Sequence, residues 1–282
     1  MLYPLSVGNA MNLFLLALTL AAAPMAQTSV DLKLNLRENE TVKYRNVYNV
    51  VTYSPEKIDE RVQNSLMTFT FGPVVDGKIP VKALIEEYEG MDLGSNSAGP
   101  AMKLINLNFN MTRKGVAEDV KHSTSNPALE PVGILLRKTL AGMNSIGFLG
   151  LTMPEKTVSV GDKWSQKVSA ASFLAPALAP AGDAFKVTGI YDVVFTLVDV
   201  TPVNGKRHAR ISVTVNGTSD LEINSPEFSA GGSLTLSSES SILVDLETGL
   251  ISSSKTDTSA DIVIGEASAQ IVTMSLLYRK VS

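Results

Sequence analysis

Hydrophobic and polar residues alternate along most of the chain, with the period of two that is typical of half-buried β-strands. In residues 105–111, apolar side chains alternate with asparagines, and in 233–241 Ser and Thr alternate with Leu234 and Leu236, which suits one hydrated and one buried face. The same alternation recurs in residues 30–36, 67–71, 191–197, 211–215 and 272–278. About eleven strands of ordinary length account for this pattern. The sequence therefore predicts an all-β fold with mainly antiparallel strands.

Two dipeptides between alternating segments predict tight hairpins. They are Asp76-Gly77 and Asn204-Gly205. Asn or Asp followed by Gly readily takes the positive φ angles of a type I′ turn. We therefore expect a two-residue β-hairpin turn at each position.

One segment, residues 126–150, breaks the strand pattern and predicts a helical insert. Asn126-Pro127 is typical of an N-cap followed by proline in the first helical turn. Apolar residues then recur at spacings of three and four, at Leu129, Val132, Leu136, Leu140 and Met143. We expect one helix here, inserted between two sets of strands.

Segments of the first half recur in the same order in the second half. The matching pairs are 42–44 with 161–164, 73–78 with 202–206, and 109–116 with 243–250. Three matches in order favour an internal duplication over the chance likeness of hairpins. The sequence therefore predicts a duplicated curved sheet or half-barrel, with an N-terminal β half (27–125) and a C-terminal β half (151–282). The halves form either one continuous domain with a pseudo-twofold relation or two small sheets face to face.

The first 26 residues predict export. Residues 13–20 are almost wholly apolar, and the run Ala-Ala-Ala-Pro-Met-Ala at 21–26 leads into polar residues. The apolar run suits the core of a signal peptide and is shorter than the roughly 18–20 residues of a membrane-spanning helix. We expect cleavage after Ala26 and a bacterial periplasmic or extracellular protein with no transmembrane span in the mature chain. The alternative is a buried N-terminal helix.

The composition of the chain excludes several classes of protein. With 24 Lys+Arg against 28 Asp+Glu and a net charge of −4, the chain lacks the basic surface of a nucleic-acid-binding protein. The absence of cysteine excludes disulfides, thiolate metal sites, cysteine nucleophiles and a lipid-modified N-terminal cysteine. No phosphate-binding, dinucleotide-binding or calcium-loop motif occurs, so we expect neither a cofactor nor a metal ion.

The residues that could support hydrolysis are few. Only His122 and His208 could supply an imidazole, and neither lies near a Gly-x-Ser-x-Gly turn. We expect both to be solvated surface histidines. The acidic cluster at 86–89 and the pair Asp257 and Asp261 suit the wet face of a strand better than a glycosidase cleft. A hydrolase is therefore the third hypothesis.

The chain resembles a bacterial family of exported proteins of unknown function. The resemblance lies in the first strand at 32–36, Gly161-Asp162-Lys163-Trp164, the Leu-rich helix at 129–143 and the turn from Asp245 to Gly249. The layout is also similar to the lipoprotein-carrier half-barrels of the bacterial envelope. That second likeness implies a curved antiparallel sheet around a helical plug, and it concerns layout alone.

These observations favour a non-catalytic envelope protein that binds an apolar or lipid-like ligand on a concave sheet. Burial of apolar area would drive such binding. The candidate ligand-binding residues are the apolar side chains expected to face inward, which are Phe69, Phe71, Leu107, Phe109, Leu136, Leu140, Trp164 and Phe195. The same residues would serve equally well as an ordinary core. The second hypothesis is a structural or protein-interaction module that offers an exposed β edge to an envelope partner.

Overall fold

The computed structural model describes residues 28–53, 58–89, 105–130, 133–134, 136–137, 151–173, 185–224, 229–264 and 267–281. The expected signal peptide, residues 1–26, lies outside these ranges. Most of the expected helical insert, including Leu140 and Met143, lies outside them too.

Nearly all of the described chain is antiparallel β-structure, which confirms the all-β prediction. The strands are β1 (Ser29–Val30), β2 (Thr41–Tyr53), β3 (Ile58–Phe71), β4 (Lys78–Glu89), β5 (Ile105–Thr112), β6 (Ala117–Thr124), β7 (Val158–Ser159), β8 (Lys163–Ser169), β9 (Phe185–Thr188), β10 (Ile190–Val203), β11 (Lys206–Asn224), β12 (Ser229–Asp245), β13 (Ile251–Ile264) and β14 (Ala267–Val281). This is more than the expected number of about eleven, because β1, β7 and β9 are too short to give an alternating pattern.

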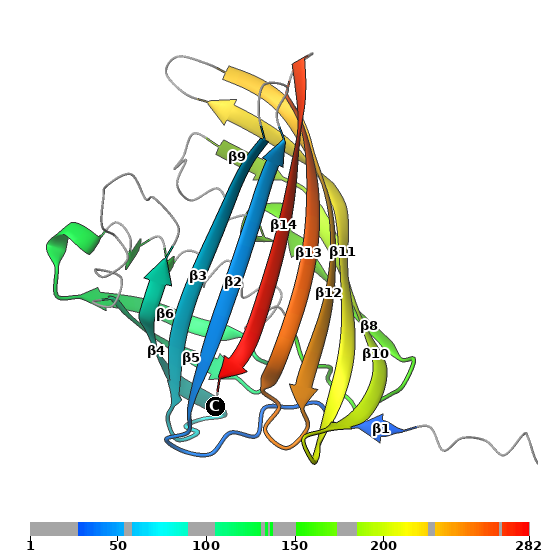
Figure 1. The fold of residues 1–282 in the computed structure, drawn as a ribbon. Helices are drawn as coiled ribbons and strands as arrows, with labels where there is room; N and C mark the ends of the chain where they lie inside the picture. Colours follow the sequence, from blue (N-terminus) through cyan, green and yellow to red (C-terminus); the bar gives the residue numbers. More distant parts are fainter. Residues whose placement is uncertain are drawn as a thin grey trace, which may run out of the picture.

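Twelve of these strands form one large curved sheet, which is open rather than closed (Figure 1). Its order is β6-β5-β4-β3-β2-β14-β13-β12-β11-β10-β8, and β9 pairs with β11 beside this path. The sheet therefore consists of two meanders, β2 to β6 and β8 to β14, that meet where β2 pairs with β14. Strands β6 and β8 end this path, and β9 is a further edge strand beside it.

Both expected hairpin turns are confirmed. Asp76 and Gly77, between β3 and β4, have φ angles of 51° and 76°, and Asn204 and Gly205, between β10 and β11, have φ angles of 50° and 79°. Positive φ at both central residues is the mark of a type I′ turn, whose twist matches that of the strands on either side.

The segments matched by the proposed duplication occupy similar places in the two meanders. Residues 73–78 and 202–206 form the β3–β4 and β10–β11 turns, while Gly115 and Gly249 lie in the β5–β6 and β12–β13 turns. Both glycines have left-handed backbones, with φ angles of 83° and 73°. The duplication itself stays a prediction.

The insert begins with the expected cap. The side chain of Asn126 accepts a hydrogen bond of 3.1 Å from the backbone N–H of Ala128, and a short 3₁₀ helix (Pro127–Leu129) follows with Leu129 buried. Residues 130, 133–134 and 136–137 are helical. Proline fits the first turn because its missing N–H would have no partner there.

The strand expected at 30–36 forms only in its first residue. Ser29–Val30 pairs with Val158–Ser159, but beyond it the backbone bonds to turns rather than to a strand, as when Asn35 N–H donates to the carbonyl of Thr248 at 2.8 Å. The alternation predicts burial correctly, because Leu32 and Leu34 are both buried. The alternation does not predict the hydrogen-bond partner of this backbone, because a segment bonded to turn carbonyls and one bonded to a strand can have the same sequence pattern.

Residues 28–36 and 151–160 together cover the end of the sheet where these turns lie, and we call them the floor. The backbone N–H of Met153 donates to the carbonyl of Lys114 at 3.1 Å, which ties the floor to the β5–β6 turn. The indole N–H of Trp164 donates to the carbonyl of Thr152 at 2.9 Å. Because Leu151 and Met153 are buried in the same core as the sheet, the floor closes this end with apolar contacts.

Candidate functional site

Most of the predicted ligand-binding residues come together on one face of the sheet, which we call the inner face. Their side chains are 0–4% exposed and belong to one apolar cluster, and they are Phe69, Phe71, Leu107, Phe109 and Phe195. The burial fits an ordinary core as well as a ligand-contacting wall, so their role in binding stays a prediction.

The remaining three predicted residues lie at the margin of this cluster or outside the described ranges. Trp164 and Leu136 are partly buried against it. The ring of Trp164 stacks on that of Phe195 with 5.4 Å between centroids and 9° between planes. Leu140 lies outside the described residues.

An apolar wall runs along the inner face of β10, β11 and β12. It consists of buried side chains at every second position, namely Tyr191, Val193, Phe195, Leu197, Ile211, Val213, Val215, Leu221, Leu234, Leu236, Ile242 and Val244. From Ile211 to Leu221 the wall is roughly 34 Å long at about 3.4 Å per residue.

A band of hydroxyl groups interrupts this wall, and we call it the hydroxyl band. On β12 and β13 it contains Ser238, Ser240, Ser254, Thr256 and Thr258. Ser238 Oγ lies 2.7 Å from Thr258 Oγ1, and Ser240 Oγ lies 2.8 Å from Thr256 Oγ1. The sequence analysis missed the band, because the Ser/Thr alternation at 233–241 does not reveal that the buried row continues from Leu236 into Ser238.

Polar groups on β2 and β3 lie in register with Ser254 of the hydroxyl band. Ser254 pairs in register with Tyr278, Tyr278 with Asn46, and Asn46 with Ser65. Asn46 Nδ2 donates to Ser65 Oγ at 3.2 Å, while the buried Oδ1 of Asn46 has no hydrogen-bond partner among the described residues. An unpaired buried acceptor is costly unless a donor reaches it.

The outer face of the same strands is hydrated. Apart from Val263 at the end of β13, its exposed residues on β11 to β13 are polar or charged, and they include Asn216, Thr218, Asp220, Thr235, Ser237, Glu239, Lys255, Asp257, Ser259 and Asp261. The contrast between the two faces rules out the outer face of β11 to β13 as an apolar binding surface.

Tyr191 supplies the titratable group of the wall. Its phenol bonds to Ser219 Oγ at 2.9 Å, and Ser219 Oγ donates to the carbonyl of Leu234 at 3.3 Å, so Tyr191 is the donor to Ser219. Burial raises the pKa of Tyr191 above its ordinary value of 10.0, and the bond to Ser219 opposes this by a smaller amount.

This raised pKa predicts a loss of stability in alkali. The folded state keeps the phenol proton to higher pH than the unfolded state, so the contribution of Tyr191 is complete below about pH 10 and is lost as pH rises through the folded pKa. Above about pH 10 the free energy of unfolding should fall less steeply with rising pH in Tyr191→Phe than in the wild type, by up to ~1.4 kcal/mol per pH unit. Urea unfolding between pH 8 and 11.5 measures it. The exposed Tyr53→Phe is the control, and an equal flattening there would contradict the prediction.

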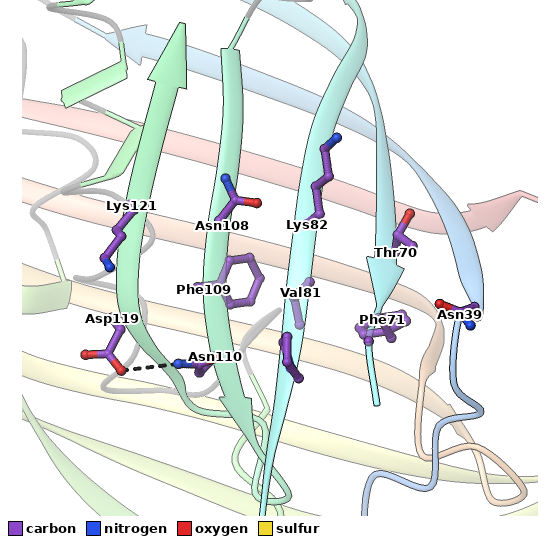
Figure 2. A pocket seen from close by; sticks show the side chains of 12 residues that line it. Asn39, Thr70, Phe71, Val81, Lys82, Asn108, Phe109, Asn110, Asp119 and Lys121 are labelled. Carbon is purple, nitrogen blue, oxygen red and sulfur yellow. Dashed lines mark hydrogen bonds between the residues drawn. The ribbon is translucent and has the colours of Figure 1, made fainter. Parts of the chain in front are cut away.

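A polar groove of ≈ 370 Å³ lies on the N-terminal meander (Figure 2). Lys82, Asn108 and Lys121 stand side by side in register across β4, β5 and β6, and all three are exposed. At its end, Asn110 Nδ2 donates to Asp119 Oδ2 at 3.3 Å. The groove combines these exposed polar and charged side chains with an apolar lining that includes Phe71, Val81 and Phe109.

The prediction that His208 is a solvated surface histidine is wrong. It is 5% exposed, with Nδ1 lying 3.0 Å from the carbonyl of Lys206 and Nε2 lying 3.0 Å from Ser252 Oγ. A carbonyl only accepts, so Nδ1 is the donor in its bond to Lys206. Asp245, its register partner, instead accepts from the backbone N–H of Glu247 at 2.8 Å. These bonds hold the adjoining turns together.

His122 is also less exposed than expected. Its side chain is 11% exposed and its Nε2 lies 2.8 Å from Glu130 Oε1 at the start of the insert. A Cβ on Gly133 would lie 2.3 Å from the ring, so the helical residues pass directly over it. The physical reason is that the insert folds back onto β6, which strand periodicity does not indicate.

The two end strands of the sheet, β6 and β8, carry features that discourage pairing with another strand. In β6 the register shifts between Asn108 and Asn110 of its partner, and Asp119 takes a left-handed φ of 54°. In β8, Lys163 and Lys167 are exposed. Bulges and edge lysines are common means of blocking edge-to-edge association, so these edges give no support to a β-augmentation module.

The described ranges contain no group of three or more His, Cys, Asp or Glu residues placed to hold a metal ion. None of their helices has the length and apolar character needed to cross a bilayer.

Comparisons with known proteins assign the chain to no family. No family model matches the chain, and no curated protein matches it. Among solved structures, the chain is similar to lipovitellin, which was studied for its lipid–protein interactions. The TM-score is 0.47 and the identity is 8%, and the match covers 88% of this chain and 26% of the lipovitellin chain. The chain is also similar to the hypothetical lipoprotein YmcC from Escherichia coli, with a TM-score of 0.21 and 10% identity over 93% of this chain and 95% of that one.

A third similar structure is a protein of Bacteroides fragilis described as having a YmcC-like fold. Its TM-score is 0.23 and its identity 12%, over 89% of this chain and 100% of that one. At such identities the likeness is one of layout, and it assigns neither ligand nor partner to this chain.

Proposed function

We propose that the protein is a non-catalytic, exported envelope protein that binds an apolar, lipid-like ligand on the inner face of its curved sheet. The observation that carries the proposal is the apolar wall along β10 to β12, opposite a hydrated outer face. Burial of an acyl chain against such a wall is worth ~25 cal/mol per Å² of apolar area. The apolar run and small residues at 13–26 support export.

The first test is native mass spectrometry of the full chain expressed with its leader and purified from the envelope fraction without detergent. We expect a polypeptide cleaved after Ala26 that carries a reproducible adduct of lipid mass, lost on organic extraction. A bare polypeptide mass in every preparation would contradict the proposal.

A pair of substitutions then separates a ligand-contacting wall from a solid core. Ala260 is buried on the inner face of β13, and the neighbouring Ser259 is exposed on the outer face. If the wall borders a ligand, Ala260→Phe should leave a folded protein from which the lipid adduct is missing, since the ring takes the place of the ligand. Ser259→Phe is the control and should keep the adduct.

The core alternative predicts a different result for the same variants. Overpacking a filled interior costs about 1–3 kcal/mol. If Ala260→Phe lowers the free energy of unfolding by that amount or more while the wild-type protein carries no adduct, the inner face is a core and the proposal fails.

A further inference from the structure

The hydroxyl band has hydrogen-bonding capacity that the described chain does not use. A hydroxyl group has one hydrogen to donate and two lone pairs to accept. In the pair Ser238–Thr258 one hydrogen joins the two oxygens at 2.7 Å, and the second has no acceptor among the described residues. The same holds for Ser240 and Thr256, whose oxygens lie 2.8 Å apart. Each pair therefore has one O–H group left to donate.

The spare group of the pair Ser238–Thr258 is buried, which makes its unused capacity significant, whereas Ser240 and Thr256 are partly buried. Ser238 is 4% exposed and Thr258 is 8% exposed. Leaving a polar group buried without its partner costs free energy, so the spare O–H of Ser238–Thr258 calls for an acceptor from outside the described residues.

The band also has a definite position in the apolar wall. On β12 it lies between Ile242 and Leu236, both buried, so apolar surface continues on either side of it. A ligand that follows the wall would thus place its polar group at the band and its chain along the apolar surface. The described side chains of the band are all neutral, which suits ester and hydroxyl oxygens better than an ionised group.

Resting on the proposed function, we infer that the ligand is a neutral acyl ester. Its ester oxygens accept from the spare hydroxyls of Ser238–Thr258 and Ser240–Thr256. The acyl chain lies along the apolar wall.

The test compares two probes with long, unsaturated chains, 1-monooleoylglycerol and 1-octadecene, each supplied from methyl-β-cyclodextrin. Their affinities for the full chain are measured by displacement of the neutral fluorophore 1-N-phenylnaphthylamine. We expect wild-type protein to bind the glycerol ester about tenfold more tightly than the alkene, as befits one or two net hydrogen bonds. Equal affinities would overturn the inference while leaving the proposed function intact, whereas binding of neither probe would remove the proposed function itself.

The double variant S238A/T258V assigns this preference to the band. Removing both partners leaves no stranded group, so the fold should be kept. We expect the preference to fall to about twofold with unchanged affinity for the alkene. The control S237A/S259A changes the register pair on the outer face of the same strands and should keep the full preference.

A preference retained by S238A/T258V would overturn the inference. If that variant does not fold, S240A/T256V removes the second pair and is read in the same way. A preference lost equally in the outer-face control would also overturn it, because the band would then not be its source.

Discussion

Replacing Gly249 by alanine is expected to destabilise the protein by about 3 kcal/mol, from backbone strain together with lost hydrogen bonds. The φ angle of Gly249 is +73°, and a Cβ there would lie 2.1 Å from the carbonyl oxygen of Lys33 and 2.7 Å from its carbon. Both are backbone atoms, so no side-chain rotation relieves the clash. The floor would have to move off the β12–β13 turn, with loss of the bond from Asn35 to Thr248.

Gly205→Ala is the matched control for this prediction. Gly205 has a similar φ of +79°, and nothing lies within 4 Å of the position its Cβ would take. Its replacement should cost only the strain of a left-handed alanine, about 1–2 kcal/mol. Urea unfolding of both variants gives the difference, and limited proteolysis within residues 28–36 reports release of the floor. Equal losses would show that the contact with Lys33 does not matter.

Phe195→Ala is expected to cost about 4 kcal/mol, since it removes a fully buried ring from the centre of the core. The side chain is 0% exposed, and its ring stacks on Trp164. Because Trp164 is the one tryptophan of the chain, its fluorescence reports the loss of this contact directly. We expect a lower urea midpoint together with a shifted emission spectrum in the folded state.

Thr196→Ala is the control, because Thr196 is the next residue of β10 and is only partly buried. It should change stability by less than about 1 kcal/mol and leave the emission spectrum unchanged. A loss below 1 kcal/mol in Phe195→Ala would contradict dense packing around this ring. It would favour a loosely filled inner face there.

The sequence predicts the parts of this fold that depend on local chemistry. Alternation predicts the strands, and the pairs Asp76-Gly77 and Asn204-Gly205 predict type I′ turns, because positive φ angles have few other causes. Asn126 likewise predicts the start of the insert. Each of these features is decided by neighbours along the chain.

Features that depend on distant partners are the ones that the sequence does not predict. His208 is buried because Lys206 and Ser252 satisfy its ring, and residue 252 is far away in sequence. Ser238 joins the inner face for a similar reason, since its hydroxyl is hydrogen-bonded to Thr258 on the neighbouring strand β13. A polar residue in an alternating strand predicts a hydrated face only when no such partner exists.

The pairing of β2 with β14 bears on how the protein folds. Their register joins Val50 to Met274, so two strands near opposite ends of the described chain lie in the middle of the sheet. Each meander is built from neighbours in sequence and can form early, but the central seam has a high contact order and must wait for the last strand. Until then β2 and β13 are unpaired edges, and a nascent chain in this state is prone to associate with others. Pairing of β2 with β14, rather than formation of either meander, is therefore the folding step that covers these two strand edges.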